Sequence, residues 1–135
     1  MLVVCWSPKG GVGTSVVAAA LALRAAADGA ETLLVDLAGD QPAILGIDPG
    51  AREGIGDWLA AGDEVPIDAL AALEVPVAER LRLLPRGSLG STDRLRVFGA
   101  LIAAGGRTVV VDAGVACDSS WAPPGHRPGL QFGHR

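Results

Sequence analysis

The sequence predicts an α/β protein built on a partial doubly wound, mainly parallel sheet of about four strands with helices on both faces. Three observations support this fold class. Short β-branched runs alternate with longer alanine-rich runs, which is the pattern of strand–helix–strand units. A glycine-rich segment joins the first strand to the first helix. The helical runs are apolar nearly all round, so both faces of the sheet must be covered.

The composition is that of one globular domain. The 135 residues are 50% hydrophobic and 19% charged, and the net charge is −4. A negative chain gives no electrostatic signal for nucleic-acid binding, and the densest basic group, residues 80–86, has the appearance of ordinary strand flanks. Cys5 and Cys117 are too far apart for a zinc motif and are expected to be small apolar fillers.

No segment has the pattern of a signal peptide or a membrane span. The N-terminus, MLVVCW, lacks a basic region and a cleavage site. The longest apolar run, VVAAALAL, is far shorter than the roughly 20 residues that cross a bilayer. A cytoplasmic protein is therefore expected.

The first part of the chain contains the clearest elements. Leu2–Trp6 is a continuous β-branched run, as expected for a strand buried on both faces. Residues 38–54 are loop-like because they contain two prolines and several glycines. The expected elements up to residue 73 are a strand at Leu2–Trp6, a helix at Thr14–Ala27, a strand at Thr32–Leu37 and short helices at residues 55–62 and 67–73.

The second part continues the alternation. A strand is expected at Arg80–Pro85, a helix at Ser91–Gly105 with Ser91 or Thr92 as its cap, and a strand at residues 107–114. In the last helix the residues at helical spacing, Leu95, Phe98, Leu101 and Ile102, are expected to be core, and so is Trp58.

The chain changes character after the last strand. Residues 117–135 are rich in proline and glycine and have no periodicity, so we expect one domain at residues 1–116 and an irregular tail at residues 117–135. His126 and His134 fall in this tail and are expected to be solvated surface residues, although two histidines eight apart are also compatible with metal binding.

The segment SPKGGVGTSVV, Ser7–Val17, is the candidate ligand-binding segment of the sequence. Glycines between a strand and a helix let successive amide groups converge on a phosphate, because no side chain blocks the approach. The helix N-terminus adds a favourable dipole. Gly10, Gly11 and Gly13 stand in this context, and Ser15 supplies a hydroxyl at the helix start that suits Mg²⁺. The sequence therefore predicts a phosphate-binding loop.

Two other interpretations of this loop remain open. The strict P-loop pattern GxxxxGK[ST] fails because Pro8 and Thr14 occupy two of its fixed positions, which allows a tight turn that binds nothing. A dinucleotide site would use Asp36, at the end of the second strand, for a ribose. The GxGxxG pattern starting at Gly11 would, however, need a glycine where Val16 stands.

KGGVGTS, Lys9–Ser15, resembles the deviant Walker A motif KGGxGK[ST] of the ParA/MinD family of dimeric P-loop ATPases. The resemblance extends over roughly residues 1–116 and includes LLVDL after the first helix and TVVVDAG as the Walker B/switch II strand. It implies a P-loop NTPase-like fold that binds ATP or ADP and Mg²⁺. It also implies a homodimer formed through the nucleotide face.

The resemblance assigns roles to individual residues. Lys9 would be the signature lysine that reaches the partner's nucleotide. The cofactor-binding residues would be Lys9, Gly10, Gly11, Val12, Gly13, Thr14 and Ser15. Ser15, Asp36 and Asp112 would serve the metal and its water shell. Lys9, Asp36 and Asp40 would be the catalytic residues.

Two departures from the motif weaken the expected hydrolysis. Thr14 replaces the P-loop lysine and cannot neutralise phosphate charge. Ala38 stands where the family often has a second acid for the attacking water, and Asp40 is a possible substitute. A loop ending in GT[ST] resembles the atypical CpaE/TadZ-like branch, which implies a positioning or regulatory protein with a pilus-assembly or cell-positioning partner and weak or absent ATP hydrolysis.

A third departure is length. The family domain continues past the switch II strand, whereas only the irregular tail follows here. Leu2–Trp6, which the family pairs on both sides, would then be an exposed apolar edge. A truncated or frame-shifted remnant without a nucleotide role is the alternative that this feature favours.

Overall fold

The computed structural model describes residues 1–48, 50, 52–63, 65–66, 68–88 and 94–115. Its strands are β1 (Leu2–Ser7), β2 (Thr32–Asp36), β3 (Val75–Ala78), β4 (Leu81–Leu84) and β5 (Thr108–Val115). Its helices are α1 (Thr14–Ala27), α2 (Gln41–Leu45), α3 (Ile55–Ala60), α4 (Ala69–Ala72) and α5 (Leu95–Ala104). The expected tail, residues 117–135, lies outside the described residues, and so do the expected helix caps Ser91 and Thr92.

The described strands form one sheet in the order β1-β5-β2-β4-β3. The pairs β1–β5, β5–β2 and β2–β4 are parallel, and only β3 runs antiparallel to its neighbour β4. The predicted α/β class with a mainly parallel sheet is confirmed. The prediction of about four strands missed β3, a short strand at the sheet edge that contains Pro76, because proline normally argues against a strand.

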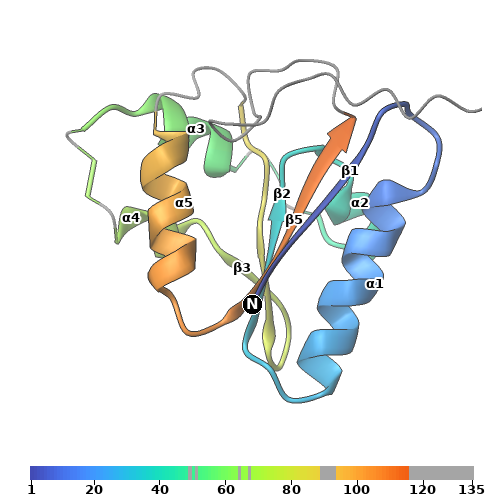
Figure 1. Cartoon of the computed structure of the whole chain (residues 1–135). Coiled ribbons are helices and arrows are strands. Elements are labelled where there is room, and N and C mark those ends of the chain that lie inside the picture. The colour runs from blue at the N-terminus through green and yellow to red at the C-terminus, as the bar shows by residue number, and fades with distance from the viewer. Residues whose placement is uncertain (49, 51, 64, 67, 89–93, 116–135) are drawn as a thin grey trace, which may run out of the picture.

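Helices cover both faces of the sheet, as predicted (Figure 1). Successive residues of β2 point to opposite faces, so Leu34 packs on one core and Leu33 and Val35 pack on the other. The first core is closed by Ala18 and Ala22 of α1, whose small side chains let the helix approach closely. The second core contains the predicted anchors, among them Trp58 of α3 and Phe98 of α5.

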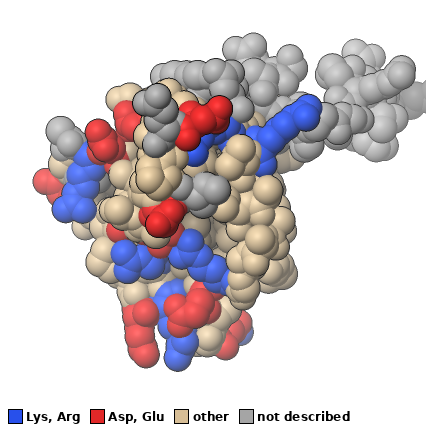
Figure 2. All heavy atoms as spheres, turned by 90° about the vertical axis from the view of Figure 1, so that its left-hand side faces the viewer, with Lys and Arg blue, Asp and Glu red and all other residues tan. Residues whose placement is uncertain are grey.

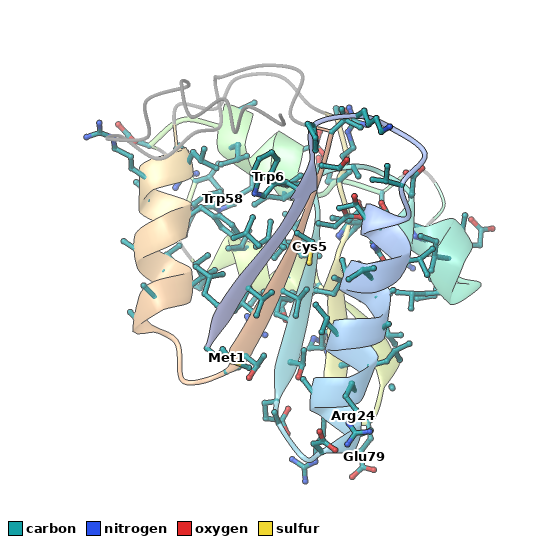
Figure 3. All side chains as sticks on the ribbon, turned by 45° about the vertical axis from the view of Figure 1, so that its right-hand side comes forward. Met1, Cys5, Trp6, Arg24, Trp58 and Glu79 are labelled. Atoms are coloured by element: carbon teal, nitrogen blue, oxygen red, sulfur yellow. The ribbon has the colours of Figure 1, made fainter. Side chains whose placement is uncertain are left out.

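From its sequence β1 is expected to be buried on both faces. This expectation is wrong for one face, which is partly exposed. Val3 and Cys5 pack toward α1, but Leu2, Val4 and Trp6 are 50%, 44% and 51% exposed. Figure 3 shows Cys5 and Trp6 pointing to opposite sides of the strand. The physical reason is that β1 lies at the edge of the described sheet, beside β5 alone, so α3 and α5 do not extend over it. The predicted exposed apolar edge is confirmed within the described residues.

The segment predicted as a loop after β2 contains a helix, α2. Pro42 occupies its first turn and Gly46 ends it with a positive φ of 67°. Proline is tolerated in the first turn of a helix, where amide groups have no intrahelical acceptor. The prolines and glycines that indicated a loop are therefore the start and stop signals of a short helix.

The surface carries scattered ion pairs. Acidic and basic side chains lie interspersed on the face shown in Figure 2. Arg82 and Arg107 both pair with Glu74, Arg80 pairs with Glu31, and Arg24 pairs with Asp28. Among the described residues, no helix is long and apolar enough to cross a membrane.

Helix α3 packs against the segment after β4 through backbone atoms. The amide of Ile55 donates to the carbonyl of Pro85 (2.8 Å), and the amide of Gly56 donates to the carbonyl of Arg86 (2.9 Å). A methyl group at Gly56 would collide with the carbonyl oxygen of Ser88. The absence of a side chain at Gly56 thus fixes the position of the chain after β4.

Replacing Gly56 by alanine is therefore expected to destabilise the protein, by about 1–3 kcal/mol or more, because overpacking forces the backbone apart. Gly99 provides the matched control: it lies within α5, and a Cβ there would meet no atom within 4 Å. Gly99→Ala should raise the free energy of unfolding by about 0.5–1 kcal/mol through helix propensity. Denaturant unfolding of both variants measures their free energies of unfolding. Equal changes in the two variants would contradict the close packing at Gly56.

Candidate functional site

A cleft of about 950 Å³ opens where the carboxyl ends of the parallel strands meet. In open α/β sheets ligands bind at this edge, outside the strand ends. The loops after β1 and β2, Arg86 after β4 and the last residues of β5 contribute to it. Its lining residues are Lys9, Gly10, Gly11, Val12, Gly13, Thr14, Ser15, Val16, Leu37, Ala38, Asp40, Ala43, Ile44, Leu59, Arg86, Leu95, Ala113, Gly114 and Val115.

The loop after β1 forms one wall of the cleft. Gly11 and Gly13 have φ angles of 74° and 81°, which other residues adopt at a cost. The hydroxyl of Ser7 bonds to both the amide and the carbonyl of Lys9 at the start of the loop. The amides of residues 10–13 have no backbone acceptor among the described residues. A turn with unpaired amides and alternating glycine conformations is the geometry that binds anions.

Helix α1 begins at the end of this loop. Gly13 is its N-cap and makes no side-chain cap bond, so the first amides of the helix also lack partners. No acidic residue occupies the first turn. Lys9, the only lysine in the sequence, is exposed on the same wall. The wall therefore combines orphan amides, a helix dipole and one positive charge, all of which favour an anionic group.

Two buried carboxylates lie behind the cleft. Asp36 ends β2 and stands opposite Asp112 of β5 in the parallel register, and both are fully buried. Asp36 accepts hydrogen bonds from the amides of Gly39 (2.6 Å) and Gln41 (3.2 Å). Burial raises the pKa of Asp36, and the nearby charge of Asp112 raises it further, whereas the bonds from Gly39 and Gln41 oppose the rise.

Gln41 connects the carboxylates to the loop wall. Its Nε2 donates to Oδ2 of Asp112 and to the carbonyl of Ser15, both at 2.8 Å. The side chain is fully buried. One amide group therefore links Asp112 of β5 to the first turn of α1. The sequence analysis missed Gln41, and its bonding partners, 26 and 71 residues away in the chain, give no local signal.

The structure separates the predicted site residues into two groups. Lys9 through Ser15 and Asp40 line the cleft, and Asp40 is exposed there. Asp36 and Asp112 are buried beneath it and do not line it. The described residues contain no group of three or more His, Cys, Asp or Glu that could hold a metal alone. The donor set suits Mg²⁺ only together with phosphate oxygens, which is the usual arrangement for that ion.

Arg86 is a cleft residue that the sequence analysis assigned to ordinary strand flanks. It follows β4 by two residues and lines the cleft. A signal for it exists in principle, because residues just past the carboxyl end of a parallel strand face the ligand edge.

The pKa of Asp36 predicts how stability changes with pH. The folded state keeps this proton to a higher pH than the unfolded state, whose value is about 3.9. The free energy of unfolding should therefore fall as pH rises through the interval between the two values, and stay lower above it. Asp36→Asn should remove that decrease, which denaturant unfolding at a series of pH values would measure.

Asp57 serves as the control, because its pKa is shifted in the opposite direction to that of Asp36. Amide bonds, first that from Gly54, lower its pKa, so its contribution is present above the unfolded value and is lost as pH falls through the folded one. Asp57→Asn should flatten the acid side of the profile instead. If the free energy of unfolding changes with pH in the same way for wild type and Asp36→Asn, burial does not raise the pKa of Asp36 and the prediction is wrong.

Comparison with known proteins finds solved structures of the same fold. No protein-family model matches the chain, and no curated protein matches it. A ParA family ATPase from Chlorobium tepidum TLS matches with a TM-score of 0.71 and 21% identity over 89% of this chain and 54% of the other. The MinC:MinD cell division protein complex of Aquifex aeolicus matches at 0.68 and 24% over 89% and 50%.

A third match is cobyrinic acid a,c-diamide synthase from Mycobacterium smegmatis, solved with bound ATP analog and magnesium. Its TM-score is 0.63 and its identity 24%, over 84% of this chain and 50% of the other. The chain thus spans about half the length of the solved structures that it matches. At these identities the likeness shows the fold alone, which the chain shares with these ParA, MinD and cobyrinic acid a,c-diamide synthase structures.

Proposed function

We propose that the chain binds ATP or ADP with Mg²⁺ in the cleft and acts as a ParA/MinD-like positioning or regulatory protein with weak or absent ATP hydrolysis. One observation carries the proposal: the unpaired amides of residues 10–13 border the cleft directly before the N-terminus of a 14-residue helix. Phosphate groups are the ligands that such a loop recognises best. The ATP analog and magnesium in the cobyrinic acid a,c-diamide synthase structure support this choice of ligand.

The side chains at the cleft favour binding over cleavage. Thr14 opens α1 with a hydroxyl where a cation would be needed to neutralise phosphate charge. Ala38 supplies no carboxylate to the attacking water, and Asp40 is the acid on the cleft wall. When bound, Mg²⁺ would neutralise phosphate charge, with Ser15 as its protein hydroxyl and Asp36 and Asp112 as supports of its water shell.

The proposed assembly follows from the same wall of the cleft. Lys9 is exposed, which suits a lysine that reaches the nucleotide of a second copy. We propose a homodimer interface on the nucleotide face. We also propose that the chain functions like the CpaE/TadZ-like branch. A pilus-assembly or cell-positioning protein would be the downstream partner, in the way that the solved MinD complex contains MinC.

Nucleotide should stabilise the folded protein through this loop. Mg·ATP or Mg·ADP at a hundredfold excess over its dissociation constant should raise the free energy of unfolding by about 2.7 kcal/mol. Gly13→Ala should abolish the rise because a side chain enters the phosphate-facing turn. Gly62→Ala is the matched control: Gly62 also has a positive φ, 71°, with open space around it, but lies outside the cleft lining. Thermal unfolding of the three proteins measures both effects.

The same experiment separates the competing interpretations. A chain without a nucleotide role would show no ligand-dependent rise for any nucleotide at millimolar concentration. A dinucleotide-binding module would respond to NAD and not to ATP. Either result would reject the proposed function, whereas equal binding by Gly13→Ala and Gly62→Ala would reject only the role of the loop.

Hydrolysis should be limited by missing positive charge at position 14. Wild type is expected to release phosphate from ATP at close to the background rate. Thr14→Lys should raise affinity for the triphosphate and speed release about a hundredfold, the effect typical of one charged or hydrogen-bonding group at the transition state. Thr14→Met, which adds length without charge, should do neither. Brisk turnover by the wild-type protein, followed by phosphate release, would contradict the proposal.

A further inference from the structure

The cleft contains a second cation besides Lys9. Of its described lining residues, Lys9 and Arg86 are basic and Asp40 is acidic. Lys9 belongs to the loop after β1, whereas Arg86 belongs to the segment after β4. The two positive charges therefore enter the cleft from different strands of the sheet.

The backbone of Arg86 is held in place by helix α3. Its carbonyl accepts the amide of Gly56 at 2.9 Å, and the carbonyl of Pro85 before it accepts the amide of Ile55 at 2.8 Å. Oδ2 of Asp57 accepts the amides of Gly54 (2.7 Å) and Ser88 (3.1 Å) and so joins the two segments. These bonds fix the point from which the arginine side chain extends.

The side chain is also held, by the loop after β2. Nη1 of Arg86 donates to the carbonyl of Ala38 at 3.0 Å. Its Cδ lies 3.1 Å from where a Cβ of Gly39 would stand, so the stem passes directly over this glycine. A guanidinium fixed at both ends loses little conformational entropy when it binds an anion.

The charge of Arg86 has no carboxylate partner among the described residues. Arg24, Arg80, Arg82 and Arg107 each pair with an aspartate or glutamate. Arg86 instead bonds to one neutral carbonyl, which uses a single donor of the five on a guanidinium. The remaining donors keep the fork geometry that matches phosphate oxygens.

The order of the sheet sets the position of this charge relative to the loop. The phosphate-binding loop follows β1, Ala38 follows β2, and β5 lies between these strands. Strand spacing then places the Ala38 backbone about 10 Å from the strand that carries the loop. Both walls belong to one cleft, so a phosphate chain anchored on the loop amides extends toward the other wall.

We propose that Arg86 binds the terminal phosphate of a nucleoside triphosphate and makes the site prefer triphosphate to diphosphate. This inference rests on the proposed nucleotide binding and adds a residue that neither the motif nor the fold comparison assigns. Arg86 supplies, from the opposite wall, positive charge that Thr14 does not supply from the helix start.

Isothermal titration calorimetry with Mg·AMPPNP and Mg·ADP tests the proposal. Arg86→Gln keeps an amide donor for the Ala38 carbonyl but removes the charge. It should weaken Mg·AMPPNP binding about tenfold to a hundredfold, the range of one charge-assisted hydrogen bond. It should change Mg·ADP binding no more than about twofold. Arg86→Lys, which keeps the charge, should retain most of the preference.

Arg96→Gln is the control for general electrostatics, because Arg96 is exposed on α5 and does not line the cleft. It should leave both affinities unchanged. If Arg86→Gln weakens both ligands equally and lowers the unfolding temperature without ligand, Arg86 only supports the loop and the proposal is wrong. Unchanged binding of both ligands also overturns it. If the wild type binds neither ligand, the proposed function itself fails.

Discussion

The parallel register of β5 between β1 and β2 is the constraint on which the site depends. It sets Asp112 opposite Cys5 on one side and opposite Asp36 on the other. A register shift between Cys5 and Trp6 pairs Trp6 with Gly114. Gly114, with φ of 65°, also lies close to Ala38, which follows β2. Slipping β5 by one residue would turn Asp112 to the other face of the sheet, away from Asp36. One set of ladder bonds thus brings the carboxyl-terminal parts of three strands together.

Gln41 connects the end of β2 and the first turn of α1 to β5 through hydrogen bonds. Its backbone amide donates to Asp36, while its side chain donates to Asp112 and to Ser15. Losing either side-chain bond would leave a desolvated donor without a partner, which costs free energy. Oε1 of the same side chain is already buried without a partner among the described residues. A movement of the loop after β2 would therefore break hydrogen bonds to the first turn of α1 and to Asp112 of β5. The bond to the carbonyl of Ser15 connects this network to the turn that follows the phosphate-facing amides.

The sequence alone predicts the elements that follow regular hydrophobic patterns. It does not predict short elements that contain a proline, or residues that are positioned by contacts far away in the chain. Long apolar runs and the glycine turn identify β1, α1, β2, β4 and β5 because burial and periodicity act locally. Strand β3 was missed because its four residues include Pro76, and α2 because Pro42 has the form of a breaker. Arg86 was missed because its partner Ala38 lies 48 residues away.

The distribution of charge explains why binding and cleavage separate in such a site. Cations that contact bound nucleotide and transition state equally well raise affinity without raising the rate. Arg86 is tied to the Ala38 carbonyl and to α3, so its position is set before any bond breaks. Faster cleavage would need a group that gains contact as charge develops, or an acid that orients water, and Thr14 and Ala38 provide neither. Under the proposed function, the identity of the bound nucleotide, and not its turnover, is the signal that the protein presents.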